Sequence, residues 1–407
     1  MVSSYGKSFF NEEKINKELP LLLKLLLNGQ AEIVTDTGLL SNAGIILPEV
    51  KSVIYSALKV NHRVMGAIIL ASNDTTPYTA ADLKLLTTLA LQSSAAIESA
   101  LLYEKNIREA KEREEAMRLV YEATGKFVPY EFIGALGHSL ITDVRLGDQV
   151  KKIVTVLFSD IRGYTTLSEQ MTPEENFRFV CSFNERMGPC IRRNKGFINQ
   201  YLGDAIMAIF PGSASDALHA AIEMQIEVQQ LNQSRLKGNQ PPIYIGIGIH
   251  TGPLIMGITG DEHRMDATTI SDTVNTASRL ESLTKHYRAS ILLSDACLIQ
   301  LEGEGFDLRY LGLVQLKGKQ EPIHIYECFS GSPTEELNKK QQTLPFFDEG
   351  INHYLNSSFD TSIKAFETVA EMHPEDHTAT FFLTSAKNYL QKGIPENWSG
   401  VVEMGMK

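Results

Sequence analysis

The chain has 407 residues, 43% of them hydrophobic and 21% charged, which suits two or three domains with buried cores and argues against a disordered or fibrous protein. Its 49 acidic and 38 basic residues give a formal net charge of −11, which argues against nucleic-acid binding because a broad nucleic-acid surface needs a basic face. The four cysteines, Cys181, Cys190, Cys297 and Cys328, form no CxxC pair and are typical of free thiols in a reducing compartment.

The N-terminal segment, residues 1–29, is expected to be helical. Its longest apolar run, Leu19–Leu27, covers nine residues and is interrupted by Lys24, whereas a membrane-spanning helix needs about 20 apolar residues. The first residues also contain no basic stretch that leads into a cleavable apolar stretch. We therefore expect no transmembrane segment and a cytoplasmic location.

Residues 30–102 combine strand-like runs with the start of a long helix. The runs Val53–Val60 and Val64–Ala71 predict an antiparallel pair joined around Asn61. A helix is expected to begin at Thr79, because Thr79 and Asp82 have the spacing of a capping box. The apolar stripe expected on this helix consists of Leu83, Leu86, Leu89, Ala90, Ile97 and Leu101.

The long helix is expected to continue through Tyr103–Arg118, where acidic and basic residues interleave. Such a run is usually a solvated helix face. The alternative is a dimer-forming signalling helix, although strict heptad apolarity fails at Glu104, Lys111 and Glu114. We assign residues 103–150 to a signalling helix and a transducer linker.

The pattern changes near residue 151. The continuous apolar run Ile153–Phe158 predicts a strand that is covered on both faces. Amphipathic stretches at 173–194 and 214–233 alternate with strand-like runs at 197–210, 243–250, 254–259, 290–294 and 306–329. This alternation predicts an α+β domain over residues 151–330.

The remaining segment, residues 331–407, is expected to be a helical tail behind the turn-rich linker Ser330–Thr334. Gly350, Phe366 and Pro374 fall at matching positions of one 34-residue tetratricopeptide-like repeat, and a plain helical hairpin is the alternative. Repeats of this kind hold other segments or partners, so a protein partner of the tail is possible.

Three places in residues 151–330 have the chemistry of a phosphate site. Asp160 ends the apolar strand, and its carboxylate is either a hard oxygen ligand for a metal or the N-cap of a helix. Asp204 lies in a Gly-Asp turn between two apolar strands. Together the two carboxylates predict a cradle for paired Mg²⁺ ions. Asn275 and Arg279 are four residues apart, so on a helix they project from one face. They form either a pair that binds ribose and phosphate or an ordinary solvent-exposed pair.

The motifs around these residues resemble the catalytic domain of class III nucleotidyl cyclases. The segments that carry the resemblance are Phe158–Thr165, Leu202–Phe210, Gly246–Gly252, Asp272–Glu281 and Leu316–Lys319. The resemblance implies a ferredoxin-like βαββαβ fold. Residues 30–102 resemble the C-terminal half of a GAF domain, through the strand at 64–70 and the helix start at 78–82; because the front half is missing, we expect no bound small molecule there.

The cyclase resemblance implies a role for each site residue. Asp160, Asp204 and the backbone carbonyl of Ile161 would bind two Mg²⁺ or Mn²⁺ ions per active site. Asn275 would orient the ribose, and Arg279 would stabilise the transition state. The residues assigned to triphosphate and substrate binding are Lys317, Gly163, Tyr164 and Thr165. Family members share each site between two chains, so the active form would be a head-to-tail homodimer.

Two positions decide the base in this family. Gln200 stands where adenylate cyclases usually have Lys and guanylate cyclases Glu, and Thr268 fits a Thr-bearing adenylate subgroup. Ser271 replaces a frequent glycine at a helix start. The predicted function is conversion of ATP to cyclic AMP and pyrophosphate. The alternatives are a guanylate cyclase, or a degenerate cyclase that acts as a regulatory or interaction module.

Overall fold

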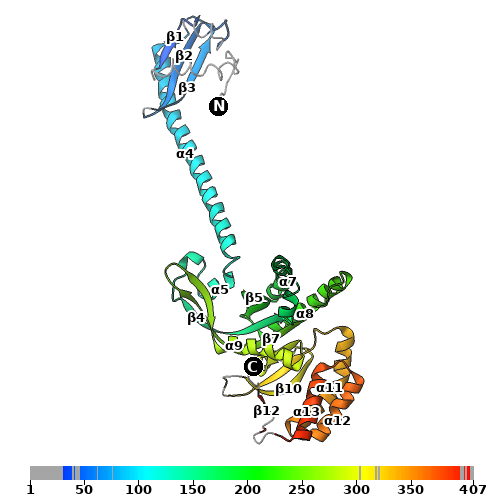
Figure 1. The fold of residues 1–407 in the computed structure, drawn as a ribbon. Helices are drawn as coiled ribbons and strands as arrows, with labels where there is room; N and C mark the ends of the chain where they lie inside the picture. Colours follow the sequence, from blue (N-terminus) through cyan, green and yellow to red (C-terminus); the bar gives the residue numbers. More distant parts are fainter. Residues whose placement is uncertain are drawn as a thin grey trace. The chain divides into compact units, whose positions relative to one another are not determined.

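The computed structural model describes residues 31–38, 41, 46–61, 63–75, 77–301, 304–316, 319, 321–394, 398 and 401–403 (Figure 1). The helix predicted for residues 1–29 lies outside them. The chain divides into two compact units, residues 1–120 and 121–407, and each is described by itself.

The first unit contains a three-stranded antiparallel sheet. Its strands, β1 (Glu32–Val34), β2 (Ser52–Val60) and β3 (Arg63–Ser72), are paired in the order β1-β2-β3. The predicted strand pair is thereby confirmed. Asn61 follows β2 with a φ of 52°, a left-handed conformation that asparagine tolerates better than most residues. The GAF resemblance remains a prediction.

Helix α4 (Ala80–Thr124) is 45 residues long, as the helix pattern predicted. The capping box is confirmed: the Thr79 backbone N–H donates to Asp82 Oδ2 at 2.8 Å, and the Asp82 N–H donates to Thr79 Oγ1 at 3.3 Å. The predicted apolar stripe is only partly right: Leu86 and Ala90 are buried and Leu83 is half-buried, whereas Leu89, Ile97 and Leu101 are exposed. Ile97 and Leu101 lie on the same helix face as the buried Leu86, Ala90 and Ser94, but the buried part of α4 ends at Ser94, so they are exposed.

One stretch of α4 is long and apolar enough to cross a membrane. Length and composition alone meet that test, and helices of soluble proteins meet it as well. The expectation of no transmembrane segment therefore stays a prediction.

The second unit is built on a mixed sheet whose centre has the predicted ferredoxin-like topology. The βαββαβ elements are β4 (Gln149–Ile161), α7 (Pro173–Arg193), β5 (Phe197–Leu202), β6 (Ala205–Phe210), α8 (Ala214–Lys237) and β7 (Ile245–Gly260). The strands run in the order β7-β4-β6-β5. Helices α7 and α8 pack against each other and cover one face of the sheet (Figure 1).

Further elements surround this centre. The short helices are α5 (Tyr130–Ala135), η1 (Ile141–Asp143), α6 (Tyr164–Ser168) and α10 (Asp295–Leu298); the remaining sheet strands are β8 (Met265–Ile270), β9 (Ile291–Ser294), β10 (Leu308–Gln315), β11 (Ile323–Cys328) and β12 (Val401–Glu403). Helix α9 (Asp272–Tyr287) joins β8 to β9 and contributes Ala277 to the core on the face opposite α7 and α8. Its side chains therefore come close to the central strands.

Two strand predictions need correction. β4 is buried on both faces from Val154 to Ser159, but Ile153 is 70% exposed. The runs at 243–250 and 254–259 form one strand, β7, rather than two. Proline cannot donate to a ladder, yet Pro253 fits here because β9 pairs with β7 up to Ile249 and β8 pairs with it from Ile255. Between Ile249 and Ile255, this edge of β7 has no paired strand among the described residues that would accept a hydrogen bond from the backbone nitrogen of residue 253.

The tail forms three helices, α11 (Thr334–Leu355), α12 (Phe359–Met372) and α13 (His377–Lys392), where one repeat or a hairpin was considered. The three helices share one hydrophobic core with α9 and with the β9-β11-β10 side of the sheet. This core includes Tyr287, Phe347 and Phe366. A Cβ on Gly350 would lie 2.9 Å from the Phe366 ring, so glycine permits this close helix packing. The tetratricopeptide resemblance remains a prediction.

A buried ion network joins the tail to the sheet. Arg309 on β10 donates to Glu327 Oε2 on β11 at 2.7 Å and to Asp376 Oδ2, at the N-cap of α13, at 2.6 Å. Lys340 on α11 lies 3.0 Å from Glu327 Oε1. Burial alone would raise the pKa of Asp376, but the Arg309 guanidinium holds it well below its ordinary value.

Replacing Arg309 by methionine should lower the free energy of unfolding of this unit by about 3–5 kcal/mol, because two buried carboxylates would lose their main partner. Urea unfolding followed by circular dichroism measures the change. The matched control is Lys339→Met, which breaks an exposed pair with Glu335 and should change little. Equal shifts in the two variants would contradict a structural role of the network.

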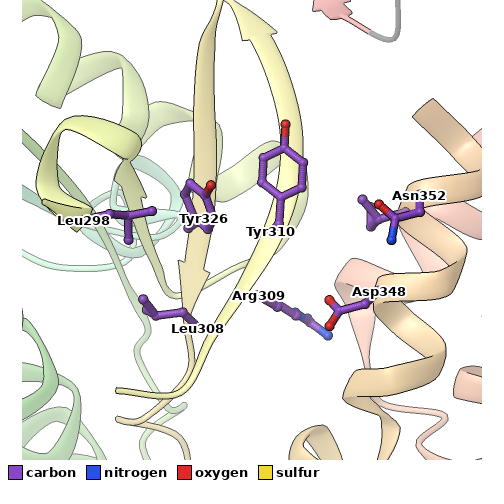
Figure 2. A pocket seen from close by; sticks show the side chains of 8 residues that line it. Leu298, Leu308, Arg309, Tyr310, Tyr326, Asp348 and Asn352 are labelled. Atoms are coloured by element: carbon purple, nitrogen blue, oxygen red, sulfur yellow. The ribbon is translucent and has the colours of Figure 1, made fainter. Parts of the chain in front are cut away.

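A surface pocket of about 340 Å³ lies between α11 and the β10–β11 pair (Figure 2). Tyr310, Tyr326 and Asp348 are among the residues that line it. None of the predicted active-site residues is in its lining. The candidate site described next is therefore separate from this pocket.

Candidate functional site

Asp160 and Asp204 lie side by side at the ends of two neighbouring strands. The β4–β6 ladder ends at the pair Ser159–Ile206, so the next residue of β4 is Asp160, beside the turn that precedes β6. Gly203 forms this turn with a φ of 71°, which favours glycine. Burial raises the pKa of Asp204 to about 6, and a hydrogen bond with Asp160 and the charge of Asp160 add to the increase.

The donor set fits a divalent cation such as Mg²⁺. Mg²⁺ is usually held by one or two carboxylates together with substrate phosphates and water. Two adjacent carboxylates, with the backbone carbonyl of Ile161 following Asp160, match this requirement. Among the described residues, no group of three or more His, Cys, Asp or Glu side chains is placed to hold a metal. The metal-binding role of the two aspartates therefore stays a prediction that their chemistry fits.

The turn after β4 leads into α6. Gly163 is its N-cap with a φ of 67°, so Asp160 is not the helix cap that the sequence allowed as an alternative. The Tyr164 hydroxyl donates to Asn176 Oδ1 at 2.8 Å, which ties the turn to α7. The Thr165 carbonyl accepts a hydrogen bond from the Ser168 hydroxyl at 2.8 Å. The predicted contact of this turn with substrate stays a prediction.

The structure adds two residues of α9 that sequence reasoning missed. Lys285 Nζ lies 2.7 Å from Asp160 Oδ2. One turn earlier, burial and then the negative charge of Asp160 raise the pKa of Glu281 to about 7. An acid four residues before a lysine is an ordinary helix ion-pair pattern, so it did not point to Asp160.

Asn275 and Arg279 lie on α9, on the N-terminal side of the residue that contacts Asp160. An α-helix rises about 1.5 Å and turns about 100° per residue, so Asn275 is about 15 Å along the axis from Lys285. Arg279 is about 9 Å along the axis and about 120° around it from Lys285. Lys285 contacts Asp160, so Arg279 projects from α9 in a different direction from the side chain that meets this aspartate.

The other predicted residues have mixed outcomes. Gln200 is exposed on β5 directly after a register irregularity, and Thr268 lies on β8, which is not a neighbour of β5. The Ser271 hydroxyl donates to the Pro253 carbonyl and accepts from the Thr273 N–H at 3.0 Å. Ser271 therefore caps α9, at the position where the resemblance to cyclases implies a frequent glycine. Lys317 lies outside the described residues.

Residues 147–328 match the family model described as the adenylate and guanylate cyclase catalytic domain. The chain is 44% identical over 209 residues to an adenylate cyclase of Anabaena cylindrica, covering 50% of this chain and 42% of that protein. It is 34% identical over 265 residues to the terminal-differentiation-specific adenylate cyclase of Dictyostelium discoideum, covering 63% of this chain and 12% of that protein.

The matched regions span less than half of each of these relatives. Among solved structures, the adenylyl cyclase CyaB from P. aeruginosa is 31% identical, with a TM-score of 0.40, over 44% of this chain and 95% of that chain. Residues 147–328 are thus similar to the catalytic domain of nucleotidyl cyclases.

Proposed function

We propose that the chain is an adenylate cyclase that converts ATP to 3′,5′-cyclic AMP and pyrophosphate. The observation that carries this proposal is the pairing of Asp160 and Asp204 at adjacent strand ends within the segment that matches the cyclase domain. Identity to two adenylate cyclases favours ATP as the substrate.

Each site residue has a part in the proposed reaction. The ribose 3′-hydroxyl loses its proton to water and its oxygen attacks the α-phosphorus in line. The bond between this phosphorus and the oxygen that bridges to the β-phosphorus breaks, and pyrophosphate leaves. Asp160, Asp204 and the Ile161 carbonyl would hold two Mg²⁺ or Mn²⁺ ions, which when bound lower the pKa of the hydroxyl and neutralise phosphate charge. Asn275 would orient the ribose, and Arg279 would stabilise the charge that develops on the phosphoryl oxygens.

The proposed active form is a head-to-tail homodimer with two shared sites. The helix geometry of α9 supports it, because Asn275 and Arg279 are displaced by about 15 and 9 Å along the axis from Lys285, the residue of α9 that contacts Asp160. In the dimer, the aspartates of one chain would face this pair on the partner chain. Each site would then be complete only when both chains contribute.

An assay of the purified chain with ATP or GTP, and with Mg²⁺ or Mn²⁺, tests the proposal. Chromatography separates the cyclic nucleotides from their precursors, and we expect cyclic AMP as the main product. No cyclic product from either nucleotide with either metal would contradict the proposal and leave the degenerate-module alternative.

Gln200→Lys should raise the ATP/GTP ratio of kcat/KM. The Gln200 amide can present a donor or an acceptor to the base, whereas lysine can only donate and forms a charge-assisted bond. We expect about a tenfold rise if the gain is near 1.4 kcal/mol.

The control for this change is Gln230→Lys, at an exposed position on α8, which adds the same charge away from the site. Its ratio should equal that of the parent chain. An unchanged or lower ratio in Gln200→Lys would show that Gln200 does not read the base and would favour Thr268. A parent chain that prefers GTP would favour the guanylate alternative.

A further inference from the structure

Within the described part of the chain, one ion pair lies at the aspartate site, and it joins Lys285 to Asp160. Its Nζ lies 2.7 Å from Asp160 Oδ2, and the two side chains are 50% and 20% exposed. Asp204 and Glu281 lie close by, so three acids share one lysine. The hydrogen bond to Asp160 raises the pKa of Lys285, which keeps the ammonium charged at neutral pH.

The end of α9 is fastened to the strand that carries Asp160. The Arg162 guanidinium, just after β4, donates to the Thr284 carbonyl at 3.2 Å and also to the Ala289 carbonyl. These bonds hold the last turn of α9 beside the strand end. Lys285 is thus kept within reach of Asp160 by a partly buried arginine rather than by chance surface contact.

The Lys285 ammonium can still leave the carboxylate. It is half exposed and sits on a flexible four-carbon stem, so its charge can move into water at little cost. Lys340 shows the opposite case: its side chain is 9% exposed and lies between Glu327 and Glu336. The Lys340 pair is thus enclosed, whereas the Lys285 pair at Asp160 is open to solvent and can exchange.

We propose that Lys285 is a counter-ion built into the site, which neutralises Asp160 when no metal is bound and competes with the divalent cation for that carboxylate. This inference rests on the proposed metal-binding role of Asp160. Lys285 is a positioning residue, since it acts on the carboxylate rather than on the substrate. Its presence raises the metal concentration that the site requires and prevents repulsion among the acids in the metal-free chain.

Mn²⁺ binding to the full chain without nucleotide tests the inference. The loss of the free-ion signal in electron paramagnetic resonance measures the dissociation constant, and Asp160→Asn defines binding that is not at the site. We expect Lys285→Met to bind Mn²⁺ about tenfold more tightly, equivalent to about 1.4 kcal/mol. Lys285→Arg retains the charge and should bind like the parent chain.

The matched control is Lys195→Met, which removes an exposed positive charge paired with Asp216 in the same domain and should not change Mn²⁺ affinity. Equal or weaker binding in Lys285→Met, or Mn²⁺ binding in the parent chain that does not depend on Asp160, overturns the inference. Tighter binding in Lys195→Met as well would also overturn it, because net charge would then be the cause.

Failure of the proposed function gives a different result. If no cyclic nucleotide forms while Lys285→Met still binds Mn²⁺ more tightly than the parent, the counter-ion role stands and the cyclase assignment falls. If cyclase activity is present and the affinities are equal, the assignment stands and the inference falls.

Discussion

Asp160→Asn and Asp204→Asn should each reduce cyclase turnover to less than about a tenth of the parent rate, since tenfold corresponds to about 1.4 kcal/mol in the barrier. Each substitution removes one of the two charged oxygen ligands proposed at adjacent strand ends, so a bound cation would keep only one of these two carboxylates. Asparagine keeps the size of the side chain, so the change acts mainly through charge.

Initial rates of cyclic AMP formation over a range of Mn²⁺ concentrations give the measurement. The control is Asp348→Asn, which removes a carboxylate on α11 that lines the pocket of Figure 2 and should leave the rate unchanged. Turnover above about a tenth of the parent rate in either site variant would refute the assignment of these two aspartates.

The central sheet and the aspartate pair could be predicted because local signals agreed with each other. Apolar strands ended at Asp160 and flanked Gly203-Asp204, and amphipathic helices separated them in the order of a βαββαβ unit. In the structure the ladder pairs Ser159 with Ile206, and this register brings Asp160 to the turn before β6.

The contacts that could not be predicted are those between distant segments. Lys285 and Asp160 are 125 residues apart, and nothing near Lys285 in the sequence distinguishes it from a surface helix lysine. Arg309 and Asp376 are 67 residues apart, so their buried pair gave no local signal that the tail shares a core with the sheet. The runs at 243–250 and 254–259 were predicted separately, and only the sheet order shows that Pro253 lies where one edge of β7 has no neighbour in the described part of the chain.

Mixing two inactive variants should restore activity if the sites are shared between chains. In a heterodimer of Asp160→Asn with Arg279→Ala, one site receives both lesions and the other receives unmutated groups from both chains. The heterodimer should therefore have about half the activity of the parent dimer, because one of its two proposed sites is intact. Two affinity tags and tandem purification isolate the heterodimer for assay.

The control combines Asp160→Asn with Asp204→Asn. Both lesions fall on the aspartate half of a site, so each of the two sites carries one of them and the heterodimer should stay inactive. Rescue in the first pair but not in the second is expected only when aspartates from one chain work with Arg279 from the other. If both heterodimers are inactive although their formation is demonstrated, Arg279 would have to act together with the aspartates of its own chain. The head-to-tail model would then be wrong.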